Sequence, residues 1–143
     1  KLNILIKIDT NGTYPDKLNE LIEKKLVDYI AVDIKAPKYK YERLTGGKID
    51  IKDIQKTIDI LQKSSIDYEF KTTIIPKLLT KKDILEIGKW LKGSKKYYLQ
   101  QFKNEMPVLS DELQYAKPYD KKYILEIIEE IKPLFKYCNA RGV

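Results

Sequence analysis

Four short apolar runs, each followed by a segment of helical periodicity, constrain the fold of this chain more than any other feature. Residues 2–9, 28–34, 66–75 and 96–102 are rich in Ile, Val, Tyr and Phe, as β-strands are. Strands separated by helices of this length run parallel, with right-handed crossover connections. The sequence therefore predicts an α/β fold of parallel strands with crossover helices.

The segments that follow the runs carry apolar stripes at helical spacing. The stripes are Leu18, Leu21, Ile22 and Leu26; Ile51, Ile54, Ile58 and Leu61; Ile84, Ile87, Trp90 and Leu91; and Ile124, Leu125, Ile127, Ile128 and Ile131. Pro15 is placed to open the first helix and Thr80 to cap the third, which we expect to stop at Gly93. Residues 135–143, FKYCNARGV, are compatible with a final strand, and residues 104–120 are expected to form a long loop.

Two parallel architectures fit this alternation, an open doubly wound sheet and part of a β/α barrel. A sheet covered on both faces is nearly all aliphatic, whereas a barrel strand faces helices on one side and the lumen on the other. The strand ends alternate polar with apolar residues, as in Asp33 and Lys35 against Val32 and Ile34. This favours the barrel, although four strands are too few to close one. We expect residues 1–143 to form one domain.

Composition limits the possible functions. The 143 residues contain no histidine and one cysteine, Cys138, which excludes imidazole chemistry and an internal disulfide framework. The net charge is +7, but the lysines alternate with acidic residues along the predicted helices, as on a solvated surface. No nucleic-acid partner is therefore expected. No apolar run reaches the length of a membrane span and no signal-peptide pattern opens the chain, so a cytoplasmic location is expected.

Polar candidates for function collect at the predicted strand ends, where active sites of parallel α/β proteins form. They are Asp9 and Asn11, Asp33 and Lys35, Lys71 and Thr73, and Gln100, Gln101 and Lys103. Asp33 and Lys35 are two residues apart on a strand, so their side chains point into the same space. A carboxylate beside an ammonium suits a zwitterion or a sugar diol.

Structural roles are possible for the same residues. The DTNG stretch, residues 9–12, is also typical of an Asx turn before a helix, with glycine supplying a positive φ. Asp33 and Lys35 could be a structural ion pair, and Lys71 is expected to pair with Glu69. Cys138 is expected to be a small buried apolar side chain.

Four motifs taken together, DTNG, YIAVDIKAP, YEFKTTIIP and YYLQQF, resemble the radical S-adenosylmethionine enzymes that activate glycyl radical enzymes. The resemblance is greatest to activators of anaerobic ribonucleoside-triphosphate reductase and of pyruvate formate-lyase. It spans essentially the whole chain, down to a closing C-x-x-RGV. It implies a partial (β/α)6 barrel of which this chain is the C-terminal part, from the third strand onward.

The resemblance also implies cofactors. Members of that family hold a [4Fe–4S] cluster on a CxxxCxxC loop and bind the cofactor's amino group with a GGE-type motif, and this chain contains neither. It begins without methionine, directly in an apolar run, so we expect it to be a piece of a longer protein. No catalytic residue and no metal ligand is expected within it.

Site residues follow from the resemblance position by position. Asp9 matches the aspartate that receives the methionine amino group of S-adenosylmethionine. Asp33 and Lys35 match the pair that binds the ribose hydroxyls and the methionine carboxylate. Thr73 and Gln100 fall where the family contacts the adenosyl group, and Lys103 stands where pyruvate formate-lyase activase has a histidine near the adenine.

The function implied is reductive cleavage of S-adenosylmethionine to generate a glycyl radical on a partner, with a flavodoxin or ferredoxin-type reductant. The 143-residue chain alone is expected to be inactive. One alternative is a self-standing α/β module that binds a nucleotide or serves as a scaffold. Another, an orotidine-phosphate decarboxylase-like barrel, needs an aspartate three residues after the strand lysine, where this chain has Lys38.

Overall fold

The structure is a computed structural model that describes residues 4–103 and 115–143. Within these residues the strands are β1 (Lys7–Thr10), β2 (Tyr29–Asp33), β3 (Asp67–Ile74), β4 (Lys96–Gln101) and β5 (Tyr137–Arg141). The helices are α1 (Pro15–Glu23), α2 (Lys38–Thr45), α3 (Ile51–Lys63), α4 (Lys81–Trp90) and α6 (Lys121–Ile131), followed by the 3-10 turn η1 (Lys132–Leu134). No helix among the described residues is long and apolar enough to cross a membrane.

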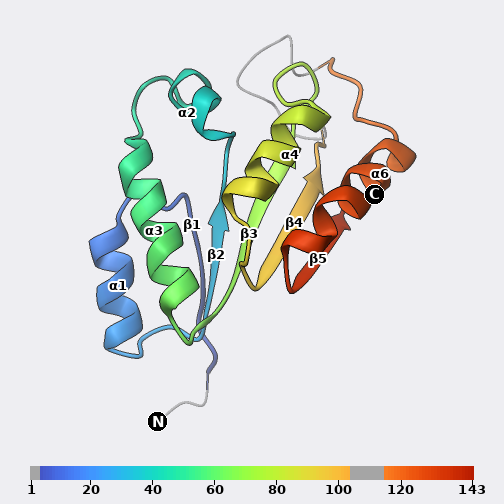
Figure 1. Cartoon of the computed structure of the whole chain (residues 1–143). Helices are drawn as coiled ribbons and strands as arrows, with labels where there is room; N and C mark the ends of the chain where they lie inside the picture. Colours follow the sequence, from blue (N-terminus) through green and yellow to red (C-terminus); the bar gives the residue numbers. More distant parts are fainter. Residues whose placement is uncertain (1–3, 104–114) are drawn as a thin grey trace.

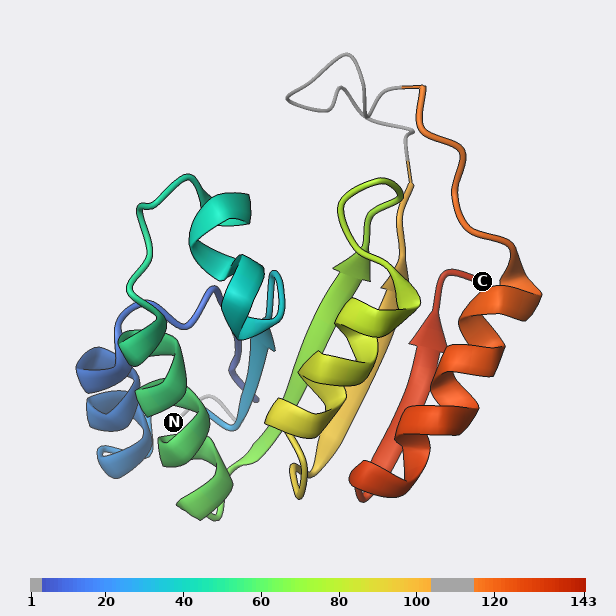
Figure 2. The ribbon, with the colours of Figure 1, turned by 45° about the horizontal axis from the view of Figure 1, so that its top comes forward.

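The five strands form one parallel sheet in the order β1-β2-β3-β4-β5. Because right-handed crossovers between strands in sequential order all pass over the same side, the helices lie on one face of the sheet (Figures 1 and 2). A doubly wound sheet would reverse its strand order and cover both faces. The α/β prediction with barrel-type winding is therefore confirmed, and the possible final strand in residues 135–143 is present as β5 (Tyr137–Arg141).

A hydrophobic core fills the space between the sheet and the helices. Its residues from the strands and the segment just after β2 include Ile30, Val32, Ile34, Phe70, Ile74, Tyr97 and Leu99. Its helix residues include Ile54, Ile58, Leu61, Ile84, Ile87, Ile124, Ile127 and Ile131. All are almost completely excluded from solvent. Most residues of the predicted helical stripes thus face the sheet, and Cys138 joins the same core as a small buried side chain. Two stripe residues do not: Leu26 lies past the end of α1 and is 52% exposed, and Leu125 of α6 is 39% exposed.

The first strand begins later than its sequence predicts. Residues 4–6 are described but lie outside β1, which starts at Lys7, opposite Tyr29 of β2. Among the described strands β1 pairs with β2 alone, and β2 begins at Tyr29, so residues 4–6 have no described strand beside them. The Ile6 amide instead donates to the Asp28 carboxylate at 2.7 Å. In the predicted loop, residues 115–120 are irregular, whereas 104–114 lie outside the described residues.

Helix α2 was not predicted, because its sequence KYKYERLT lacks an apolar stripe. Contacts with other elements hold it in place. Tyr41 is buried and packs edge-on against Trp90. Asp83, in the first turn of α4, accepts hydrogen bonds from Tyr39 Oη at 2.5 Å and Lys40 Nζ at 2.7 Å. The same carboxylate completes the predicted Thr80 cap of α4 as a capping box.

Candidate functional site at the polar face of the sheet

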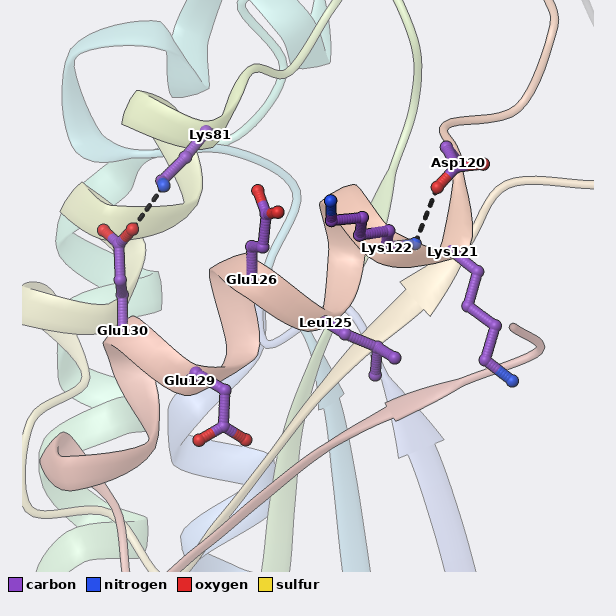
Figure 3. Close-up of a pocket in the computed structure, with 8 residues that line it drawn as sticks. All are labelled: Lys81, Asp120, Lys121, Lys122, Leu125, Glu126, Glu129 and Glu130. Carbon is purple, nitrogen blue, oxygen red and sulfur yellow. Dashed lines mark hydrogen bonds and ion pairs between the residues drawn. The ribbon is translucent and has the colours of Figure 1, made fainter.

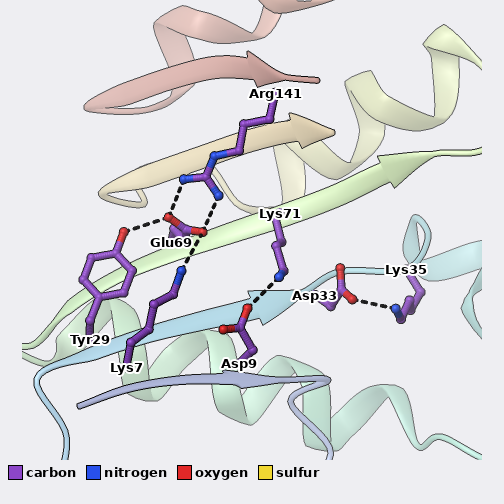
Figure 4. A network of polar contacts seen from close by, with 8 residues as sticks. All are labelled: Lys7, Asp9, Tyr29, Asp33, Lys35, Glu69, Lys71 and Arg141. Carbon is purple, nitrogen blue, oxygen red and sulfur yellow. Dashed lines mark hydrogen bonds and ion pairs between the residues drawn. The ribbon is translucent and has the colours of Figure 1, made fainter. Parts of the chain in front are cut away.

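The sheet face turned away from the helices is polar, and we call it the open face. Successive strand residues point to opposite faces, so the partners of the buried core residues line it. They include Lys7, Asp9, Tyr29, Ala31, Asp33, Glu69, Lys71, Thr73, Lys96, Tyr98, Gln100, Tyr137, Asn139 and Arg141. Figure 4 shows that Lys7, Asp9, Asp33, Glu69, Lys71 and Arg141 project from this face of neighbouring strands. The strand patterning that predicted a polar lumen therefore matches this face.

A turn held by side-chain hydrogen bonds follows β1. Asn11 Oδ1 accepts hydrogen bonds from the Thr13 amide at 3.2 Å and the Thr13 hydroxyl at 2.7 Å, which is the expected Asx turn. Gly12 has a φ of 77°, and its carbonyl accepts a hydrogen bond from the Thr57 hydroxyl at 2.7 Å. The turn is thus fixed to α3 through Thr57. Asp9 takes no part in these bonds and projects from β1.

Asp9 forms an ion pair with Lys71 of β3, whose Nζ donates to Asp9 Oδ1 at 2.6 Å (Figure 4). The contact between Asp9 and Lys71 passes over β2 at Ala31, which is the register partner of Asp9. Because the Ala31 side chain is only a methyl group, it leaves room for the two longer side chains to meet. The Asp9 side chain is 55% exposed and that of Lys71 22%. The hydrogen bond from Lys71 lowers the pKa of Asp9 from its ordinary value.

Asp33 and Lys35 form a second ion pair beside the first, with Lys35 Nζ donating to Asp33 Oδ2 at 2.7 Å. Asp33 is the register partner of Lys71, so the two pairs are neighbours on the open face. The Lys35 amide donates to the Tyr41 hydroxyl at 3.2 Å, which fixes the segment after β2 to α2. Both side chains are partly exposed. The shared space predicted from their spacing is present.

Glu69 is the centre of a more buried network toward the other edge of the sheet. Arg141 of β5 donates to both Glu69 oxygens, at 2.7 and 2.9 Å, and Tyr29 donates to Oε2 at 2.9 Å. The guanidinium stacks on Tyr98, 3.3 Å from the ring centroid. Lys7 Nζ lies 3.7 Å from Glu69 Oε1.

This arrangement corrects the predicted pairing of Lys71 with Glu69. Because the strands are tilted, side chains of alternate strands meet across the strand between them, as in the layers of β/α barrels. Glu69 therefore meets Arg141, and Lys71 meets Asp9. Burial raises the pKa of Glu69, but the hydrogen bonds from Arg141 and Tyr29 outweigh it, so the net shift is downward. Glu69 is held as a carboxylate.

The remaining predicted residues lie at different depths of the same end. Thr73 of β3 and Gln100 of β4 are register partners on the open face, and Gln100 is next to Arg141. Lys103 follows β4 and lies beside Gly142, since a Cβ placed on Gly142 would be 3.5 Å from Lys103 Cε. The structure thus brings Asp9, Asp33 and Lys35 together, places Thr73 and Gln100 on the same face, and sets Lys103 beyond the strand end.

The chain does not fit a [4Fe–4S] cluster, which is held by several cysteine thiolates. Its one cysteine, Cys138, is buried, and burial raises the pKa of the thiol to about 12. Over residues 4–103 and 115–143, no group of three or more His, Cys, Asp or Glu side chains could hold a metal ion.

A hollow of about 800 Å³ lies elsewhere, on the outer surface of α6 beside α4 (Figure 3). Two contacts join residues of its lining: Lys81 pairs with Glu130, and Asp120 accepts a hydrogen bond from the Lys122 backbone amide at the helix start. This surface is on the helix side of the sheet, apart from the charges of the open face. We assign the candidate site to the open face because it joins opposite charges at the carboxyl ends of the strands.

Comparison with known proteins gives two matches. Residues 1–91 match the radical SAM superfamily. A protein of Methanocaldococcus jannaschii, provisionally named a glycyl-radical enzyme activating enzyme, is 40% identical over 101 residues. The matched segment makes up 68% of this chain and 42% of that protein, so the chain spans less than half the length of this relative.

Proposed function

Because this chain belongs to the radical SAM superfamily, we propose that it supplies S-adenosylmethionine-binding residues to a glycyl-radical enzyme activating enzyme. The observation that carries the proposal is the adjacent pair of ion pairs, Asp9 with Lys71 and Asp33 with Lys35, at the carboxyl ends of β1 to β3. Two acids and two lysines in one space match a ligand that has an ammonium, a carboxylate and a ribose diol.

Each residue has a definite role in the proposal. Asp9, charged at neutral pH, accepts hydrogen bonds from the methionine ammonium of S-adenosylmethionine. Asp33 accepts from the ribose hydroxyls, and Lys35 donates to the methionine carboxylate. Thr73 and Gln100, on the neighbouring strands, contact the adenosyl group. Lys103, past the end of β4, lies toward the adenine.

S-adenosylmethionine is the source of the reactive group, because one-electron reduction cleaves its C5′–S bond. This cleavage leads to removal of a hydrogen atom from a glycine of the partner enzyme. The residues of this chain bind and orient the ligand and exclude water from it. The electron would come from a [4Fe–4S] cluster bound outside this chain and reduced by a flavodoxin or ferredoxin-type protein. The partner would be a glycyl radical enzyme of the anaerobic ribonucleotide reductase or pyruvate formate-lyase type, in the cytoplasm.

Titration calorimetry of the chain with S-adenosylmethionine tests the binding role. We expect weak, saturable binding that falls about tenfold or more in Asp9→Asn and in Asp33→Asn, because each loses a charge-assisted hydrogen bond. Asp16→Asn is the matched control, since Asp16 is an exposed acid of α1 that pairs with Lys56. Absence of binding by the unmodified chain would refute the role. Equal binding of adenosine nucleotides that lack the methionine group would favour a nucleotide-binding module instead.

A second measurement addresses activity. After reconstitution with iron and sulfide under reducing conditions, the chain is expected to form no 5′-deoxyadenosine, because it has one cysteine and that cysteine is buried. Detection of 5′-deoxyadenosine by chromatography would show that the chain acts alone, contrary to the proposal.

A further inference from the structure

We propose that Lys71 is a specificity-determining residue of the open-face site, which selects zwitterionic amino-acid groups by occupying Asp9 until a ligand replaces it. The inference rests on the proposed function, and it concerns a residue that sequence reasoning assigned to a different partner. Without ligand, the Lys71 ammonium takes the place at Asp9 that a ligand ammonium would take, at 2.6 Å from Oδ1.

The surroundings of Lys71 determine what happens when it is displaced. Glu69, two residues earlier on the same face, already accepts three hydrogen bonds from Arg141 and Tyr29. Asp33, its register partner on β2, stays engaged by Lys35 when the ligand brings no carboxylate to Lys35. A displaced Lys71 therefore finds no free carboxylate among the described residues around it. Because its side chain is only 22% exposed, leaving the ammonium unpaired is costly.

A ligand carboxylate removes that cost. A group that brings an ammonium alone can replace Lys71 at Asp9, but it leaves Lys71 without a partner. A group that brings a carboxylate alone meets the uncompensated charge of Asp9 once Lys71 turns toward it. An α-amino acid brings both charges on neighbouring atoms, so Asp9 and Lys71 each exchange their mutual contact for a contact with the ligand.

Charge balance supports the same conclusion. Asp9, Asp33, Lys35 and Lys71 carry two negative and two positive charges, so their pairs are neutral without ligand. A zwitterionic group adds no net charge and preserves this balance. Specificity then arises from a penalty on incomplete ligands as well as from attraction to the complete one.

The test measures three ligands against three proteins by NMR titration, which determines weak affinities. The ligands are S-adenosylmethionine, its decarboxylated form, and 5′-methylthioadenosine, which has no amino-acid group. The proteins are the unmodified chain, Lys71→Met, and Lys96→Met as the control. Lys96 lies on the same face over the Tyr29 ring, and among the described residues no carboxylate pairs with it.

The expected effects differ in sign. In Lys71→Met the affinity for S-adenosylmethionine falls about tenfold, because a charged hydrogen bond to its carboxylate is lost. The affinity for the decarboxylated ligand rises, because no lysine competes for Asp9. The affinity for 5′-methylthioadenosine stays within about twofold of its value in the unmodified chain. Lys96→Met changes the affinity for none of the three ligands. Lys71→Arg, which keeps the charge, is expected to retain the preference for the carboxylate.

Other outcomes separate the two proposals. If Lys71→Met weakens all three ligands equally, Lys71 supports the fold only and the inference is overturned while the proposed function stands. If it weakens both amino-acid-bearing ligands equally, or changes none, Lys71 does not read the carboxylate and the inference is again overturned. If the unmodified chain binds none of the ligands, the proposed function and the inference fail together.

Discussion

Replacing Arg141 by methionine is expected to lower the free energy of unfolding by about 2–4 kcal/mol. Arg141 donates two hydrogen bonds to Glu69, whose side chain is only 2% exposed. Removing one partner of a buried ion pair costs about 3–5 kcal/mol because the other charge is left uncompensated. The lower range applies here because Tyr29 still donates to Glu69 and because Arg141, 38% exposed, lies where water can enter. Methionine keeps much of the apolar stem against Tyr98.

Urea denaturation followed by circular dichroism measures this loss, and a double-mutant cycle isolates the pair. Glu69→Gln alone is expected to cost less, about 1–2 kcal/mol, since the freed guanidinium can turn to solvent. The coupling energy between Arg141→Met and Glu69→Gln should exceed about 1 kcal/mol. Lys56→Met is the matched control, because Lys56 and Asp16 also pair at 2.7 Å but are well exposed. We expect no measurable change there.

The pH dependence gives an independent check. The folded-state pKa of Glu69 lies below its ordinary value, so its contribution is complete above the unfolded-state pKa. The contribution is lost as the pH falls through the folded-state pKa. In Arg141→Met that pKa rises, so stability should fall less steeply on acidification. A loss below about 0.5 kcal/mol, as for an exposed pair, together with an unchanged acid slope, would refute the reasoning.

Two further changes test the turn and the helix cap. Gly12→Ala is expected to lower the free energy of unfolding by about 1–2 kcal/mol, because φ is 77° and the new Cβ would lie 3.2 Å from Val32 Cγ1; an unchanged urea midpoint would contradict this. At Asp83, burial raises the pKa, but hydrogen bonds led by those from Lys40 and Tyr39 hold it at about 2. Its stabilisation is thus present above the unfolded-state value and lost as the pH falls toward 2. Asp83→Asn should flatten the acid limb of stability against pH, and a limb as steep as that of the unmodified chain would argue against this role.

The strands and four of the helices could be predicted because their apolar periodicity coincides with burial against a single core. Helix α2 could not, because Asp83 and Trp90, both distant in sequence, hold it in place. The first strand was predicted to begin too early, because the apolar periodicity of one segment does not show where the neighbouring strand begins. In each case the missing information concerned contacts between elements.

The sequence predicted which strand-end residues gather on one face and that Asp33 and Lys35 share one space, but not the pairings that join different strands. Asp9, Asp33 and Lys35 could be found because strand ends meet at one edge of a parallel sheet. That Lys71 reaches Asp9 depends on strand tilt and on the small size of Ala31, which a single strand's sequence does not reveal. Arg141 was missed as a participant, although its alternation with Tyr137 and Asn139 on a possible final strand was an available signal.

The sequential strand order also bears on how the chain reaches its folded state. Among the described residues each strand pairs only with strands next to it in the sequence, so pairing within β1 to β5 can follow the order of synthesis. The exception is Glu69. Its guanidinium partner arrives with β5, so in an intermediate that lacks β5 the carboxylate has only Lys7 at 3.7 Å and the Tyr29 hydroxyl among its described partners. Docking of the last strand then adds the two guanidinium hydrogen bonds as well as the backbone hydrogen bonds of β5.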